Sequence, residues 1–195
     1  MNIHIRQETP ADAQAIEAVT IAAFEHAAHT SHTEQFIVRA LRARGQLTVS
    51  LVAIEGERLV GHVAVSPVRI DGRAGDWYGL GPISVRPDCQ GRGIGSLLMA
   101  QALDALRLLR AGGCVLLGDP AYYARFGFRA EPGLTLPGVP PEYFMALALA
   151  GTVPNGSVAY SEAFDATKPP AGADTSSISQ RSEIGGIQHS KPRVH

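Results

Sequence analysis

Three glycines alternate along the stretch Gln90-Gly91-Arg92-Gly93-Ile94-Gly95-Ser96. Glycine has no Cβ and tolerates positive φ, so such a loop can turn tightly and bring its backbone close to a ligand. An amphipathic helical pattern begins at Ile94, and the first N–H groups of a helix lack intrahelical acceptors and carry partial positive charge. The stretch therefore predicts an anion site, usually for phosphate, to which Arg92 could add a charged fork.

Two familiar phosphate-binding motifs do not fit this loop. A P-loop ends in Gly-Lys-Ser/Thr, and the absence of a lysine here argues against an NTPase. A dinucleotide fingerprint needs Gly-x-Gly-x-x-Gly, but Ser96 stands at its third glycine and no parallel βαβ unit is expected before it. A glycine-rich turn without a ligand stays open as the alternative for the loop taken alone.

A third pattern, Gln/Arg-x-x-Gly-x-Gly/Ala, fits every position from Gln90 to Gly95. It resembles the acetyl-CoA loop of the GNAT N-acetyltransferase superfamily. Further along, Tyr123 takes the tyrosine position of the pattern Tyr-x-x-x-Gly-Phe, which resembles the second signature of that superfamily. The short helix that carries Tyr123 would be capped by Asp119 and end at Gly127. Two signatures in the right order are more specific than either alone, and the wider run is similar to a bacterial subgroup of acetyltransferases with poorly defined acceptors.

Hydrophobic periodicity supplies the elements around these stretches. Strands alternate apolar and polar residues or form short apolar runs, whereas helices repeat apolar residues at helical spacing. The expected order is strand, two helices and three consecutive strands, which favours an antiparallel meander over a doubly wound sheet. We expect strands at 3–6, 47–54, 59–70, 77–85, 114–117, 134–136 and 143–149, and helices from Thr9, from a capping box of Ser31 and Glu34 to Gly45, and over 94–111.

The strand before the loop, Tyr78 to Val85, contains Gly79, Gly81 and Pro82. Proline cannot donate to a ladder and glycine weakens a strand, so a bulge or an exposed edge is expected. One interpretation is an irregular, weakly paired strand with no role in ligand binding. The other is a strand that splays from its neighbour and leaves backbone groups free for an extended ligand.

The resemblance implies one α/β (α+β) domain, with a mixed, mostly antiparallel sheet splayed into a V and helices on both faces. We expect this N-acetyltransferase domain to cover residues 1–152. Residues 153–195 are expected to form a flexible, largely disordered tail, because Ser, Gly, Pro, Thr and Ala dominate its last forty residues and large apolar side chains are few.

Composition limits the protein's class. A net charge of −1 over 195 residues argues against a nucleic-acid binder, and no apolar run is long enough for a membrane span. No signal peptide is expected, and the two cysteines, Cys89 and Cys114, have no metal-binding spacing. We therefore expect a cytoplasmic protein without a metal, as a monomer or homodimer.

The resemblance also implies the chemistry. Acetyl-CoA would be the co-substrate, with its pantetheine paired to the strand at Ile83 and Val85. The acceptor would be a small-molecule or protein amine that attacks the thioester directly. As catalytic groups, Tyr123 would donate to the leaving sulfur and the Val85 N–H would polarise the carbonyl, while Tyr122 is expected to be a packing residue. The implied cofactor-binding residues are Ile83, Val85, Gln90, Gly91, Arg92, Gly93, Ile94, Gly95 and Ser96.

Three questions stay open at this stage. The base that deprotonates the amine could be Glu25, His26, His29, His32, Glu34, His62 or water. A non-catalytic acyl-CoA-binding regulator could use the same pocket, although a regulator has no need of Tyr123 as a donor. A nucleotide-binding oxidoreductase is disfavoured by Ser96 and by the antiparallel start of the sheet.

Overall fold

The computed structural model describes residues 2–25 and 33–168. Its helices and strands alternate much as the apolar periodicity predicts. In chain order they are β1 (Ile3–Gln7), α1 (Ala13–Phe24), α2 (Glu34–Ala43), β2 (Val49–Glu55), β3 (Arg58–Ile70), β4 (Arg73–Val85), α3 (Ile94–Leu108), β5 (Gly113–Leu117), α4 (Pro120–Tyr123), β6 (Leu134–Thr135), β7 (Phe144–Ala148) and β8 (Gly156–Ala159).

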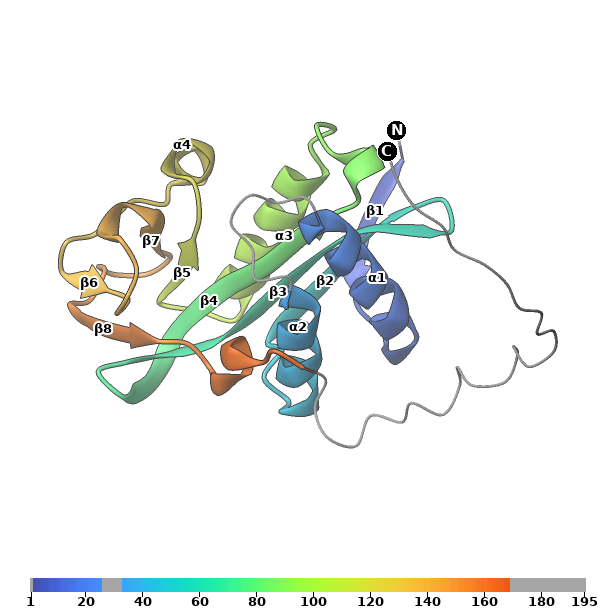
Figure 1. Cartoon of the computed structure of the whole chain (residues 1–195). Helices are drawn as coiled ribbons and strands as arrows, with labels where there is room; N and C mark the ends of the chain where they lie inside the picture. The colour runs from blue at the N-terminus through green and yellow to red at the C-terminus, as the bar shows by residue number, and fades with distance from the viewer. Residues whose placement is uncertain (1, 26–32, 169–195) are drawn as a thin grey trace, which may run out of the picture.

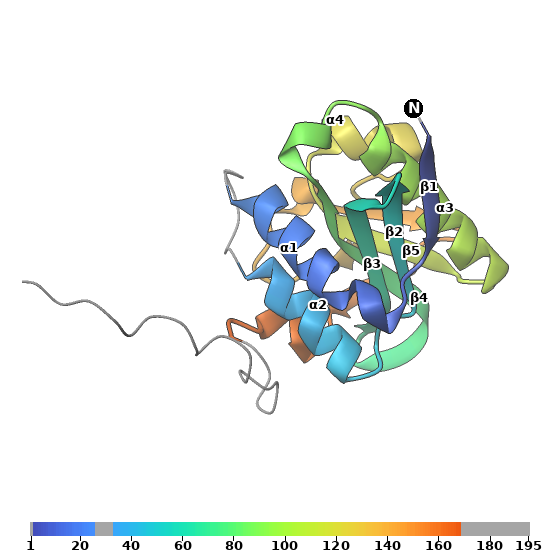
Figure 2. The ribbon, with the colours of Figure 1, turned by 90° about the vertical axis from the view of Figure 1, so that its right-hand side faces the viewer.

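The main sheet has the strand order β1-β2-β3-β4-β5-β7. Strands β1 to β4 form the expected antiparallel meander, and β7 is antiparallel to β5. Only the β4–β5 pair in this order is parallel. Helices α1 and α2 cover one face and α3 covers the other (Figures 1 and 2). The predicted mixed, mostly antiparallel sheet with helices on both faces is therefore confirmed.

Strands β4 and β5 part after a short pairing. They are hydrogen-bonded only from Trp77–Gly79 to Gly113–Val115. Beyond Gly79, β4 stays paired with β3, whereas β5 continues with β7. A bulge lies at the parting point, because Gly81 and Pro82 together oppose the single residue Ala64. The sheet thus opens into the predicted V.

A polar cluster is buried between the sheet and the end of α2. The guanidinium of Arg42 donates two hydrogen bonds of 2.9 Å to the carboxylate of Glu8. Ser50 Oγ donates to the same carboxylate at 2.5 Å, and it lies 2.8 Å from Nε2 of the fully buried His62. Since the hydroxyl proton goes to Glu8, His62 Nε2 must be the donor to Ser50, which leaves Nδ1 as a bare acceptor without a partner in the described structure.

This cluster holds charged and neutral groups in fixed states. Burial raises the pKa of Glu8, but hydrogen bonds from His62, Arg42 and Ser50 outweigh it and lower the pKa from 4.5 to about 2. Burial lowers the pKa of His62 below 6.5, against the opposing effect of Glu8. Both folded-state values are depressed, so both groups contribute stability that is present above their unfolded values and is lost as the pH falls.

We expect acid to destabilise the protein in two stages, first below pH 6.5 as His62 is forced to protonate and then below pH 4.5 as Glu8 is. Replacing Glu8→Gln removes the charged hydrogen bonds to Arg42, and should lower the free energy of unfolding at pH 7 by about 1.5–3 kcal/mol. Urea unfolding at pH 7 and pH 4 measures this. Glu57→Gln, in the exposed β2–β3 turn, is the control; equal stability of the two variants at pH 7 would contradict the role of the cluster.

The segment after residue 152 is part of the fold. Strand β8 pairs with the end of β3 and with β6. The ring of Tyr160 lies against Gly79 and leaves no room for a Cβ there, and its centroid is 4.6 Å from that of Phe164, which packs against α2. The predicted flexible segment 153–195 is therefore wrong for residues 153–168. Average composition concealed a few well-placed apolar side chains; residues 169–195 lie outside the described structure.

Two truncations are expected to differ sharply. Removing residues 153–195 takes Val158 and Tyr160 from the sheet and Phe164 from α2. Each buried apolar side chain contributes on the order of 1.5–3 kcal/mol, so the melting temperature should fall by many degrees or the domain should fail to fold. Removing only residues 169–195 takes away few large apolar residues, and should leave the melting temperature nearly unchanged. Calorimetry on both truncated proteins would refute this if the two melted at the same temperature.

Candidate functional site

The glycine loop presents unpaired backbone N–H groups at the start of α3. Gly91 and Gly93 have φ of 72° and 80°, and a Cβ at either position would meet nothing within 4 Å. Leu97 N is the first helical donor to Gly93 O, at 3.0 Å, and no side chain caps the helix. The N–H groups of residues 94–96 therefore have no intrahelical acceptor, which is the property that lets a helix N-terminus bind an anion.

Arg92 has a partner that the sequence did not predict. Its guanidinium binds the carboxylate of Glu55 at the end of β2 through both terminal nitrogens, with Nη1 3.2 Å from Oε2. The guanidinium that was expected to bind a phosphate is therefore already paired with Glu55. The backbone, rather than this side chain, supplies the free donors of the loop.

The edge of β4 that faces β5 is open beside the loop. Arg86 N donates to Val60 O of β3 at 2.9 Å, and successive residues of a strand direct their N–H groups to opposite edges. The N–H groups of Ile83 and Val85 therefore point into the V, where β5 has already diverged. The side chain of Gln90 donates to Val85 O at 3.0 Å, which ties the glycine loop to this edge.

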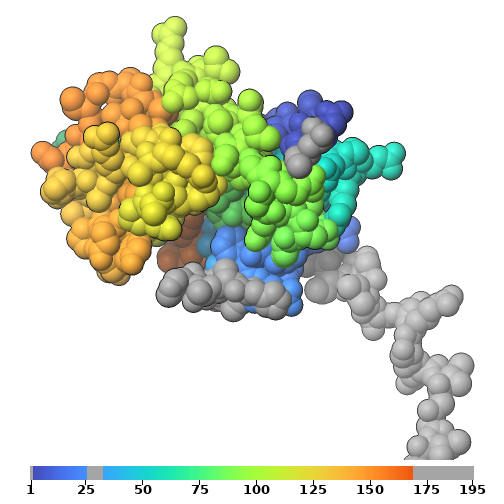
Figure 3. All heavy atoms as spheres, turned by 90° about the horizontal axis from the view of Figure 1, so that it is seen from above, coloured from blue at the N-terminus to red at the C-terminus, as the bar shows by residue number. Residues whose placement is uncertain are grey.

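A cleft of about 450 Å³ lies between the two arms of the V. In the space-filling view from above, the yellow atoms around residues 125–135 face the green atoms around residues 85–100 across a recess (Figure 3). One wall comes from β4, the loop and α3, and the other from the segment after β5. The lining residues are Ile83, Val85, Gln90, Gly95, Gly118, Asp119, Tyr122 and Tyr123.

Tyr123 faces the cleft with a protonated hydroxyl. Its ring packs against Gly118, where a Cβ would collide with it, and forms a T-shaped pair with Phe128 at a centroid distance of 6.4 Å. Burial raises the pKa of Tyr123, and Tyr122 and Asp119 raise it further, so the hydroxyl keeps its proton at neutral pH. Within the described residues, no hydrogen bond occupies this hydroxyl, which leaves it available as a donor.

Tyr122 is a cleft residue rather than a simple packing residue. The guanidinium of Arg125 lies 3.7 Å from the centroid of its ring. Its hydroxyl lies 3.4 Å from the position that a Cβ on Gly95 would take, so it reaches from one arm of the V to the first turn of α3 on the other. The expectation that Tyr122 only packs the short helix is corrected here.

The candidate bases are scattered. His62 is fully buried in the Glu8 cluster, Glu25 is exposed at the end of α1, and Glu34 opens α2. None of these three lines the cleft. His26, His29 and His32 lie outside the described residues.

Sequence reasoning missed Gly118 and Asp119 as cleft residues. Asp119 caps α4 by accepting a hydrogen bond of 2.9 Å from Ala121 N, and Gly118 provides the flat surface beneath Tyr123. Both residues directly follow β5. Their position at the end of a central strand, opposite a phosphate loop, is the signal that could have identified them. In the described part of the chain, no three His, Cys, Asp or Glu side chains gather as metal ligands, and no helix there could span a bilayer.

Comparison with known proteins agrees with this geometry. Residues 13–128 match the model of the acetyltransferase (GNAT) family. The N-acetyltransferase YhbS of Escherichia coli strain K12 is 40% identical over 125 residues, which cover 64% of this chain and 72% of that protein.

Two solved structures share the fold. A GNAT family acetyltransferase from Brucella melitensis, in complex with acetyl-CoA, is 49% identical with a TM-score of 0.76 and covers 84% of this chain and 99% of its own. YhbS from Escherichia coli, in complex with CoA, is 34% identical with a TM-score of 0.78, covering 87% and 95%. The chain belongs to the GNAT acetyltransferase family.

Proposed function

We propose that the protein transfers an acetyl group from acetyl-CoA to an amine by direct attack, with the cleft between β4 and β5 as its active site. The observation that carries this is two sets of free backbone donors that border one cleft, at the open edge of β4 and at the first turn of α3, both faced by Tyr123. The acetyl-CoA and CoA held by the two similar structures support the same ligand.

The backbone donors suit the two ends of the cofactor. The amides of residues 91–96 would hold the pyrophosphate, each charge-assisted contact contributing about 1.5–3 kcal/mol. The open edge at Ile83 and Val85 would pair with the amides of the pantetheine arm, as an added strand does. Arg92 would contribute only if it exchanged Glu55 for a phosphate.

The reaction then needs few side chains. The amine nitrogen attacks the thioester carbonyl carbon, the C–N bond forms and the C–S bond breaks, and the electron pair moves to sulfur. The Val85 N–H polarises the carbonyl oxygen, and Tyr123 donates to the sulfur. Because a thiol has a pKa near 8.5 and that of Tyr123 is above its ordinary 10, Tyr123 acts as a hydrogen-bond donor to developing charge. Glu25, Glu34 and His62 do not line the cleft, and Asp119, which does, caps α4, so we assign the removal of the amine proton to water.

The non-catalytic regulator is the second candidate. An unpaired, protonated Tyr123 hydroxyl in the cleft favours the enzyme, because a regulator gains nothing from it. A cytoplasmic location, a monomeric or homodimeric state and the absence of a nucleic-acid partner remain parts of this proposal. An amine screen with detection of released thiol tests the activity itself, and acetyl-CoA binding without acetylation of any amine would favour the regulator.

Gly93→Asn is expected to weaken acetyl-CoA binding at least about tenfold, the equivalent of one lost charge-assisted contact. Asparagine tolerates the left-handed conformation of Gly93, so the fold should survive while the added side chain occupies the open space where the pyrophosphate would lie. Isothermal titration calorimetry measures the affinity. Gly56→Asn, also at positive φ with nothing within 4 Å, is the matched control, and equal affinities in the two variants would place the phosphates elsewhere.

Tyr123→Phe should lower kcat by about 10²–10⁴-fold, the usual contribution of a positioned proton donor. Its acetyl-CoA affinity should change little, because that hydrogen bond strengthens as charge builds on sulfur. Tyr122→Phe keeps the Arg125 stacking and should affect cofactor affinity more than turnover, since its hydroxyl lies beside Gly95. If Tyr122→Phe lost turnover and Tyr123→Phe did not, the roles would be reversed; full activity of both would make water the donor.

A further inference from the structure

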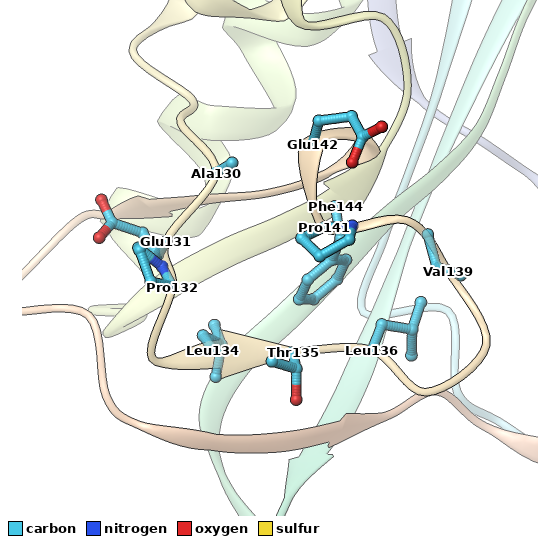
Figure 4. Close-up of a pocket in the computed structure, with 10 residues that line it drawn as sticks. All are labelled: Ala130, Glu131, Pro132, Leu134, Thr135, Leu136, Val139, Pro141, Glu142 and Phe144. Carbon is cyan, nitrogen blue, oxygen red and sulfur yellow. The ribbon is translucent and has the colours of Figure 1, made fainter.

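A second hollow of about 460 Å³ lies beside β6 and the start of β7. Its walls are mainly apolar: Figure 4 shows Phe144 and Pro141 in the middle, with Leu134 and Leu136 below them. Val139 closes one side. This volume lies within the range of about 300–1,000 Å³ typical of small-molecule sites.

Two carboxylates stand at the rim of this apolar hollow. Glu142 lies above Phe144, and Glu131 lies on the other side of the opening (Figure 4). Across the described residues, neither carboxylate forms an ion pair or a side-chain hydrogen bond, although Arg129 is close in sequence. Unpaired negative charge beside an apolar surface favours a ligand that combines a cation with an apolar body.

The hollow is connected to the proposed active site through β5. Phe144 stands opposite Leu117 in the β5–β7 pair, so their side chains share one face. Leu117 is 47% exposed, and the next residue, Gly118, lines the cofactor cleft and donates to Tyr143 O at 3.0 Å. The hollow and the cleft therefore lie beside neighbouring strand ends, with the exposed Leu117 next to Gly118 between them.

We propose that this hollow binds the apolar part of the acceptor, which is a small primary amine with an aromatic or branched aliphatic group. The inference rests on the proposed acetyl transfer. Glu131 and Glu142 attract the ammonium form of the acceptor, Phe144 and Leu136 bury its body, and Leu117 continues the apolar surface towards the thioester. Anionic acceptors and strongly polar amines are disfavoured by the same surface.

Steady-state kinetics with acetyl-CoA would test the acceptor class. 2-Phenylethylamine should be acetylated with a kcat/KM at least about tenfold above that of ethanolamine, because each apolar group buried in a pocket contributes about 10- to 200-fold. If amines are acetylated but ethanolamine is as good as 2-phenylethylamine, the inference is overturned and the proposed function stands. If no amine is acetylated, both the proposed function and this inference are overturned. Calorimetry with CoA present then shows whether 2-phenylethylamine still binds. Binding without transfer would leave the hollow a binding site but would still overturn its assignment to an acceptor.

Two variants assign the effect to the hollow. Ala130→Trp, at an exposed lining position, should fill it and remove the preference for 2-phenylethylamine while acetyl-CoA affinity is unchanged. Glu131→Gln and Glu142→Gln should each raise the KM for 2-phenylethylamine by about twofold to fivefold, as expected for exposed charges. Glu57→Gln, far along the chain in an exposed turn, is the charge control. A retained preference in well-folded Ala130→Trp, or equal effects of the three glutamine variants, overturns the inference.

Discussion

The parting of β4 from β5 is the constraint on which the rest of the structure depends. The N–H and C=O groups of a strand inside a sheet are hydrogen-bonded to the two neighbouring strands, and unpaired groups are destabilising when water cannot reach them. Here pairing stops at Gly79, and the bulge at Gly81 and Pro82 turns the next residues away from β5. The edge at Ile83 and Val85 is left open to the cleft, where solvent or a ligand can satisfy it.

Keeping the V open requires support on both sides of the sheet. On one face, α3 packs through Leu98 and Leu106 against β2 and β3, which fixes the glycine loop at its start. On the other face, Tyr160 lies on Gly79, the last residue of the paired region. The C-terminal segment thus packs at the point of divergence, which explains why a stretch of low apolar content still belongs to the folded domain.

The sequence predicted the features that the backbone encodes. Gly91 and Gly93 need positive φ, Gly127 ends the short helix at positive φ, and the Gly81-Pro82 pair marks the bulge, so residue type and spacing sufficed for the loop, the short helix and the V. Contacts between distant segments were not predictable in this way. The Glu8–Arg42–Ser50–His62 cluster joins α2, β2 and β3 to the connection after β1, and Arg92 pairs with Glu55 across 37 positions of the chain. Neither leaves a local pattern.

The same distinction separates the two sides of the proposed reaction. The cofactor side uses mainly backbone amides, which any sequence with the right glycines presents, so it can be recognised from a short motif. The hollow next to β5 is built instead from side chains of β6, the following connection and β7, and its charge comes from Glu131 and Glu142. Substitutions at these positions change shape and charge without disturbing the glycine loop. Acceptor preference can therefore vary while the cofactor motif stays the same, and the proposed acceptor class depends on the assembled structure rather than on that motif.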